Sequence, residues 1–153
     1  MMANLFKHHP SPFMLAHLQS VFCTLDEDAL SVRIQEFLRF IYLQSLKDGG
    51  FIPVTDEIDQ IWHEYILQTR EYLALCNDLP HAQFVHHQTA TLATYIQTRN
   101  RKEVIQDMLM WIPTYVETFG KFTEKTAPYW TIVQFLLKHT SLTLSQLNSI
   151  TFR

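Results

Sequence analysis

Residues 55–76 read TDEIDQIWHEYILQTREYLALC, and apolar side chains recur every three or four positions along this stretch. That spacing is the period of an α-helix with one buried face, and no glycine or proline interrupts it. Thr55, followed by three carboxylates within four residues, suits a helix start, because the hydroxyl can cap it and the carboxylates favour its positive end. We therefore expect one continuous amphipathic helix here, ending before Pro80.

Helical patterns also occupy most of the remaining chain. Apolar positions recur at helical spacing over residues 26–47, where Thr24 and Glu27 match a capping box and Gly49-Gly50 provides a stop. A further helical stretch is expected over residues 89–119, with an interruption near Asn100, a bend at Pro113 and a stop at Gly120. Another helix is expected over 129–138, and Thr143 and Gln146 cap a short last one. Loops are expected over 78–88 and 121–128. Because no strand-like alternation or repeat is present, the sequence predicts an all-α, compact bundle of five to seven helices. We expect one domain, residues 1–153, with residues 1–10 flexible.

The composition fits a globular domain and excludes several classes of partner. Of 153 residues, 47% are hydrophobic and 18% are charged, which is enough apolar surface for one core. A net charge of -3 gives no positive field for DNA or RNA, and the cluster Arg99, Arg101 and Lys102 is too short to supply one. No apolar run approaches the roughly 20 residues that cross a bilayer. Cys23 and Cys76 do not make a disulfide framework, so the expected compartment is the cytoplasm.

Polar residues suited to chemistry gather between Asp56 and His87. At about 100° per residue, Asp59 and His63 lie roughly 40° apart around a helix and present their side chains to one point. Both lie at an edge of the apolar face, where a neighbouring loop can complete a site. A carboxylate and an imidazole one turn apart suit a divalent metal, and zinc or iron is the expected ion.

The loop after Pro80 supplies the other candidate ligands, if the chain reverses there and returns past the helix. It contains three histidines, of which His81 is expected to be exposed. The predicted metal ligands are Asp59, His63, His86 and His87. Adjacent histidines rarely face one point, so the choice between the last two stays open. A solvated Asp-His pair and a polar loop explain the same residues without a metal.

Other functions are also compatible with these residues. If a bound metal activates water, Glu64 or Asp56 is a candidate acid or base, although no substrate is indicated. The alternative is a non-enzymatic module that binds another protein through aromatic residues near the loop over 121–128. Those aromatic residues are Tyr115, Phe119, Phe122, Tyr129 and Trp130. A cysteine enzyme that uses Cys76 is the weakest alternative, because that residue lies on the apolar stripe.

The pattern Asp-x-x-Trp-His, Ile-Leu-x-Thr, Tyr-x-x-x-Cys and a histidine after the next loop resembles the glycine-rich domain-containing protein-like family. The matching residues are Asp59, Trp62, His63, Ile66, Leu67, Thr69, Tyr72, Cys76, His86 and His87, with weaker matches at Tyr115, Phe119, Gly120 and Trp130. The resemblance spans about residues 51–130. The activity of that family is poorly defined, so the resemblance implies one shared arrangement of Asp59, His63 and His86 without a reaction. The loop over 77–83 departs from the pattern, since it lacks a glycine before the Phe-x-x-His element.

Overall fold

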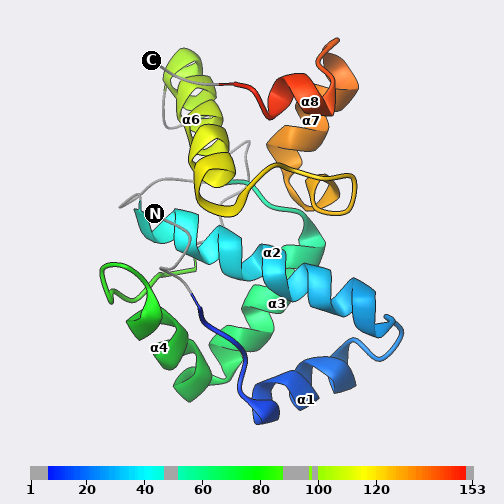
Figure 1. Ribbon diagram of the computed structural model, residues 1–153. Coiled ribbons are helices and arrows are strands. Elements are labelled where there is room, and N and C mark those ends of the chain that lie inside the picture. The colour runs from blue at the N-terminus through cyan, green and yellow to red at the C-terminus, as the bar shows by residue number, and fades with distance from the viewer. Residues whose placement is uncertain (1–6, 47–51, 88–96, 98–99, 151–153) are drawn as a thin grey trace.

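The structure, a computed structural model, is all-α in the residues that it describes, which are 7–46, 52–87, 97 and 100–150 (Figure 1). In order, its helices are α1 (Pro12–Val21), α2 (Glu27–Leu46), α3 (Asp56–Leu67), α4 (Thr69–Asp78), α6 (Arg101–Phe119), the 3-10 helix η1 (Ala127–Tyr129), α7 (Thr131–His139) and α8 (Leu144–Leu147). Among the described residues no strand occurs, and an isolated antiparallel bridge joins Val54 to Trp130. The prediction of an all-α bundle of five to seven helices is confirmed.

Helix α2 lies across the middle of the molecule, with α1, α3 and α4 on one side and α6, α7 and α8 on the other (Figure 1). Its two faces are both buried. Phe37 packs against Tyr65 of α3 with 5.1 Å between ring centroids, whereas Tyr42 packs against Phe119 at the end of α6 at 5.4 Å. This central position explains why apolar residues occur on more than one face of the α2 sequence.

The cap of α2 differs from the prediction. Helix α2 begins at Glu27, and the carboxylate of Asp26 accepts a hydrogen bond from the backbone N–H of Ala29 at 2.7 Å. The predicted Thr24 capping box is therefore wrong, because Asp26 directly precedes the first helical residue and caps at least as well as threonine. The capping box of α8 is confirmed, with both reciprocal hydrogen bonds between Thr143 and Gln146 present.

The predicted continuous helix over residues 55–76 is two helices, α3 and α4. The break is at Gln68, whose backbone leaves helical geometry with φ −89° and ψ 76°. The apolar face continues across the break, since Tyr65 on α3 and Tyr72 on α4 are both buried. A single non-helical residue turns the chain around the core without disturbing the three-to-four spacing, which is why the spacing alone predicts one helix.

The N-terminal segment contains a helix that the sequence did not predict. Ser11 caps α1 by accepting a hydrogen bond from the N–H of Met14 at 3.1 Å, and Pro12 occupies the first helical turn. Before this helix, His8 is buried, and its Nδ1 atom lies 2.8 Å from the carboxylate of Asp78 at the end of α4. His8 is thus packed against the bundle, whereas residues 1–6 lie outside the described residues, so the predicted flexibility of residues 1–10 stays a prediction.

The second half of the chain follows the predicted order of helices. The side chain of Asn100 caps α6, Pro113 lies inside that helix, and Gly120 ends it with φ 94°, a conformation that favours glycine. The predicted helical stretch before Asn100 lies largely outside the described residues. Helix α7 starts two residues later than predicted, at Thr131, after the turn of η1. None of the described helices combines the length and the apolar character needed to span a membrane.

Candidate metal centre

Three side chains from two parts of the chain converge at one end of α3. The Nε2 atom of His87 lies 2.9 Å from Oδ1 of Asp59 and 3.0 Å from Nε2 of His63. The Nε2 atom of His63 lies 3.4 Å from Oδ2 of Asp59. Asp59 and His63 are one turn apart on α3, and His87 comes from the loop that follows α4. We call these three residues the Asp-His-His cluster; its ligand atoms all lie within 4.8 Å of one another.

The separations of these atoms are those of ligands around one small cation. Two ligand atoms that each lie about 2.1 Å from an ion are about 3.0 Å apart at a right angle and about 3.4 Å apart at the tetrahedral angle. The separations of 2.9, 3.0 and 3.4 Å lie close to this range, although two of them involve different oxygens of Asp59. One ligand atom from each residue lies within 4.8 Å of the others, so some rearrangement of the side chains would close the cluster around an ion.

Protons alone cannot satisfy all three contacts. The Nε2 atom of His87 faces both His63 and the carboxylate of Asp59, which when ionised only accepts hydrogen bonds. If this Nε2 carries a proton, the proton can be donated to Asp59 and shared with an unprotonated Nε2 of His63, but the lone pair of His63 then faces Oδ2 of Asp59 3.4 Å away. If it carries no proton and accepts from His63, its lone pair points at a carboxylate oxygen 2.9 Å away. One divalent cation would satisfy all three atoms at once.

The cluster is open to solvent on one side. The side chains of Asp59 and His63 are 39% and 52% exposed, whereas that of His87 is 15% exposed. An ion held here would have protein ligands on its buried side and coordination positions facing outward. Such positions are where water or a small molecule binds in three-ligand sites.

Two hydrogen bonds and a ring contact hold in position the loop that contains His87. The hydroxyl of Tyr72 on α4 donates to the backbone carbonyl of Val85, two residues before His87. The indole N–H of Trp62 on α3 donates to the same hydroxyl at 3.0 Å. The Trp62 ring also packs against the imidazole of His87, with 4.3 Å between the ring centroids. The neighbours of Asp59 and His63 on the helices therefore determine where the loop ligand lies.

The reversal of the chain after α4 uses a strained residue. Ala82 has φ 47°, in the left-handed region, and its N–H donates to the carbonyl of Leu79 at 2.9 Å. Glycine adopts this conformation without steric cost, whereas alanine does not. The position lies in the loop where the sequence lacks the glycine expected from the resemblance.

The structure separates the predicted loop ligands. His86 is exposed, and its ring packs against Phe84 with 4.9 Å between the centroids. Its side chain does not join the Asp-His-His cluster found among the described residues. His81 is also exposed, as predicted. The backbone alternates direction along this extended stretch, so of two adjacent histidines only His87 turns toward α3.

The two candidate acid or base residues are not part of the cluster. The carboxylate of Glu64 lies 2.8 Å from Nε2 of His17 on α1, so it is already engaged in joining α1 to α3. Asp56 is exposed at the start of α3. Among the described residues, neither carboxylate belongs to the group of ligand atoms formed by Asp59, His63 and His87.

The residues behind the two rival hypotheses are mostly in the core. Cys76 is buried beside Tyr72 and the backbone of Val85, and burial raises the pKa of its thiol. A raised pKa disfavours the thiolate, which is the nucleophilic form. Of the five aromatic residues proposed to bind a partner, three are buried in the core. These are Tyr115, Phe122 and Trp130.

A buried carboxylate that the sequence analysis did not single out organises the other side of α2. Glu36 is fully buried, and its Oε2 atom accepts hydrogen bonds from the hydroxyl of Tyr115 and the indole N–H of Trp130, both at 2.8 Å. Its Oε1 atom accepts from Arg39 at 2.9 Å. A signal was present in the sequence, because Glu36 interrupts the second apolar face formed by Val32 and Phe40. A charge inside an apolar face implies a buried partner.

Comparison with known proteins places the chain in a family. The profile of the UCP032817-like family matches residues 3–118, which is most of the chain and includes all three cluster residues. The chain belongs to the UCP032817-like family. No curated protein and no solved structure shows detectable similarity to it. The match does not test the resemblance to the glycine-rich domain-containing protein-like family, which stays a prediction.

Proposed function

We propose that the protein binds one divalent transition metal ion, zinc or iron, through Asp59, His63 and His87. The observation that supports this most directly is the convergence of two imidazole nitrogens and a carboxylate in three mutual contacts, of which protons alone leave one unsatisfied. Imidazole favours zinc, iron, nickel and copper over magnesium or calcium, and one carboxylate does not change that order. His86 is not a ligand in this proposal.

A bound ion would act as a Lewis acid toward water or a small molecule in the outward-facing positions. The chain itself contributes the orientation of the ligands. The helical spacing holds Asp59 and His63 in register, and the packing of Trp62 on the His87 ring fixes the third ligand. The family match names no activity, so the proposal specifies metal binding and leaves the reaction and substrate open.

The test is the metal content of tag-free protein purified without chelator, measured by plasma mass spectrometry. His63→Ala and His87→Ala are compared with the wild type, and His86→Ala is the matched control from the same loop. We expect near-stoichiometric zinc or iron in the wild type and in His86→Ala, and loss of that metal in the other two. Circular dichroism should show unchanged helicity, because an exposed side chain such as that of His63 contributes little to stability.

Two results would contradict the proposal. One is a wild-type protein that neither retains metal nor takes up zinc, iron, nickel, copper or manganese on titration. The other is equal metal content in the wild type and His87→Ala. Either result would direct attention to the alternative of a protein-binding module.

A further inference from the structure

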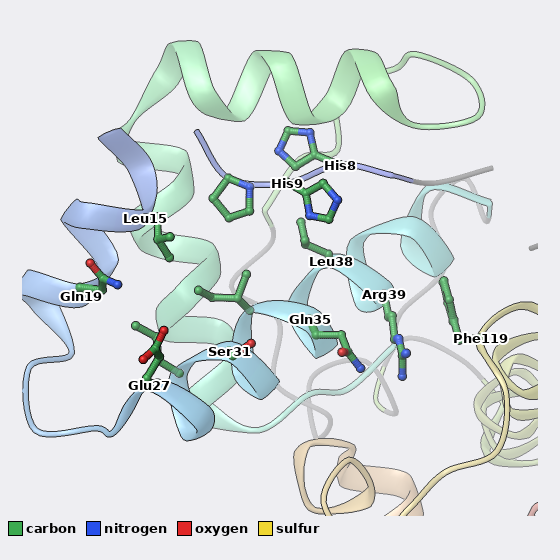
Figure 2. A pocket seen from close by; sticks show the side chains of 13 residues that line it. His8, His9, Leu15, Gln19, Glu27, Ser31, Gln35, Leu38, Arg39 and Phe119 are labelled. Atoms are coloured by element: carbon green, nitrogen blue, oxygen red, sulfur yellow. The ribbon is translucent and has the colours of Figure 1, made fainter. Parts of the chain in front are cut away.

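A cavity lies on α2, at a place that shares no residue with the Asp-His-His cluster (Figure 2). It is a half-open trough of about 520 Å³, within the range of about 300–1,000 Å³ typical of small-molecule sites. Helix α2 forms its floor, α1 and residues 8–10 form one wall, and Phe119 lies at one end beside Arg39. We call it the α2 trough.

The floor of the trough has an apolar row beside the polar side chains of Ser31 and Gln35. Leu30, Ile34 and Leu38 follow one another at intervals of one helical turn and line its length. Leu15 of α1 adds an apolar side chain that is 39% exposed. Leu30, Ile34 and Leu38 are each more than nine-tenths buried already, so the hydrocarbon part of a ligand would cover chiefly Leu15 and the remaining edges of these side chains. Removing that apolar surface from water is favourable. The trough therefore suits an elongated apolar body.

The end of the trough at Arg39 holds a guanidinium group that is oriented in advance. Its Nη1 atom donates to Oε1 of Glu36 at 2.9 Å and to the hydroxyl of Tyr115 at 2.8 Å. The group also lies over the rings of Tyr115 and Phe119, at 5.6 Å and 5.3 Å from their centroids. Among the described residues, both hydrogen bonds of Arg39 use Nη1. The donors on Nη2 and Nε are the pair that a carboxylate engages through two parallel hydrogen bonds.

The charges around the trough set the direction of a ligand. Glu27 lines the far end and would repel an anion there, so an anionic group belongs beside Arg39. The carboxylate of Glu36 offsets part of the positive charge of Arg39. Its Oε2 atom accepts hydrogen bonds from Tyr115 and Trp130, and these stabilise the carboxylate without removing its charge. A second carboxylate would therefore be held mainly through the donors on Nη2 and Nε of Arg39, which make no hydrogen bond among the described residues.

We propose that the α2 trough binds a small monocarboxylate with an unbranched apolar chain. The carboxylate pairs with the free edge of Arg39, and the chain lies along Leu38, Ile34 and Leu30. Binding is independent of the metal cluster, because the two sites share no residue.

The test is isothermal titration calorimetry with octanoate, compared with 1-octanol, which has the same chain length and no charge. We expect octanol to bind about tenfold more weakly, since a charge-assisted bidentate pair is worth about 1.4 kcal/mol or more. Arg39→Lys keeps a positive charge beside Glu36 but loses the planar fork, and should weaken octanoate binding by a similar factor. Ser31→Trp fills the trough from an exposed position and should abolish binding, whereas Ser31→Ala should not change it.

Circular dichroism checks that each variant is folded, and His63→Ala should bind octanoate as the wild type does. The proposal is overturned if octanoate does not bind the wild type at millimolar concentration, or binds no better than octanol. It is also overturned if folded Ser31→Trp binds octanoate with unchanged affinity. A wild-type protein that binds octanoate but neither retains nor takes up metal would count against the metal proposal alone.

Discussion

The hydroxyl of Tyr72 joins the core to the loop that bears His87. Removing it in Tyr72→Phe leaves the Val85 carbonyl and the Trp62 indole N–H without their shared partner. We expect the variant to keep its helicity and to bind metal about 10-fold more weakly, as is typical when a group that orients a ligand is lost. Titration with a competing chelator measures this affinity.

Tyr65→Phe is the matched control for this prediction. Tyr65 is equally buried, but its hydroxyl has no hydrogen-bond partner among the described residues. Its removal should leave metal affinity unchanged. Equal weakening in both variants would mean that Tyr72 affects the site only through general stability.

The helical spacing predicted that Asp59 and His63 lie together, and it left open which loop histidine joins them. The four-residue spacing of Asp59 and His63 is a property of the helix itself, and the structure has that spacing. The choice of His87 over His86 depends on the turn at Ala82 and on the Tyr72 contact with Val85. Both are tertiary features, and neither follows from the order of residues in the loop.

The start of α2 allows a direct test of a helix cap. Asp26→Ala removes the carboxylate that accepts from the N–H of Ala29, and should lower the free energy of unfolding by about 1 kcal/mol. Thr24→Ala should have almost no effect, because Thr24 is exposed and precedes the cap. Urea unfolding of both variants measures the difference. A larger loss of stability in Thr24→Ala than in Asp26→Ala would instead support the capping box predicted from the sequence.

Elements with strong local signals were predictable, and those shaped by packing were not. The capping box of α8 and the glycine that ends α6 are local features, and both are present in the structure. Helix α1 has only two buried apolar residues, Met14 and Leu18, so its pattern is weak. The break at Gln68 follows from wrapping α3 and α4 around one core, a requirement that periodicity does not express.

At the scale of the whole molecule, Glu36 links α2 to α6 and to the start of α7. Glu36→Gln should lower the free energy of unfolding by about 3 kcal/mol, because it leaves Arg39 without its buried counter-charge. Glu124→Gln, on an exposed loop, is the control and should change it by less than about 0.5 kcal/mol. Denaturant unfolding monitored by tryptophan fluorescence distinguishes the two. Equal small effects would show that the buried network adds nothing to stability.

Three buried tyrosines predict a loss of stability at alkaline pH. Burial raises the pKa of Tyr65, Tyr72 and Tyr115 far above the ordinary value of 10.0. In the unfolded chain these hydroxyls ionise near that ordinary value, whereas in the folded chain they stay neutral. The contribution of these three hydroxyls to the free energy of unfolding should therefore be constant up to about pH 9 and fall as the pH rises above about 10. A series of denaturant titrations across this range measures the slope, and a flat profile would contradict it.

The bundle as a whole followed from composition and periodicity, but its arrangement around α2 did not. Glu36 on α2 contacts Tyr115 and Trp130, which are far away in the sequence, and such pairs have no local pattern. The same is true of the Asp-His-His cluster, whose third member comes from a loop.

The most direct test of the central claim is a crystal structure of protein loaded with zinc, with anomalous diffraction recorded at the zinc edge. We predict one strong anomalous peak about 2.0–2.2 Å from a carboxylate oxygen of Asp59 and from Nε2 of both His63 and His87, with His86 turned away. A map with no peak between these three side chains, or a zinc ion held by other residues, would contradict the account.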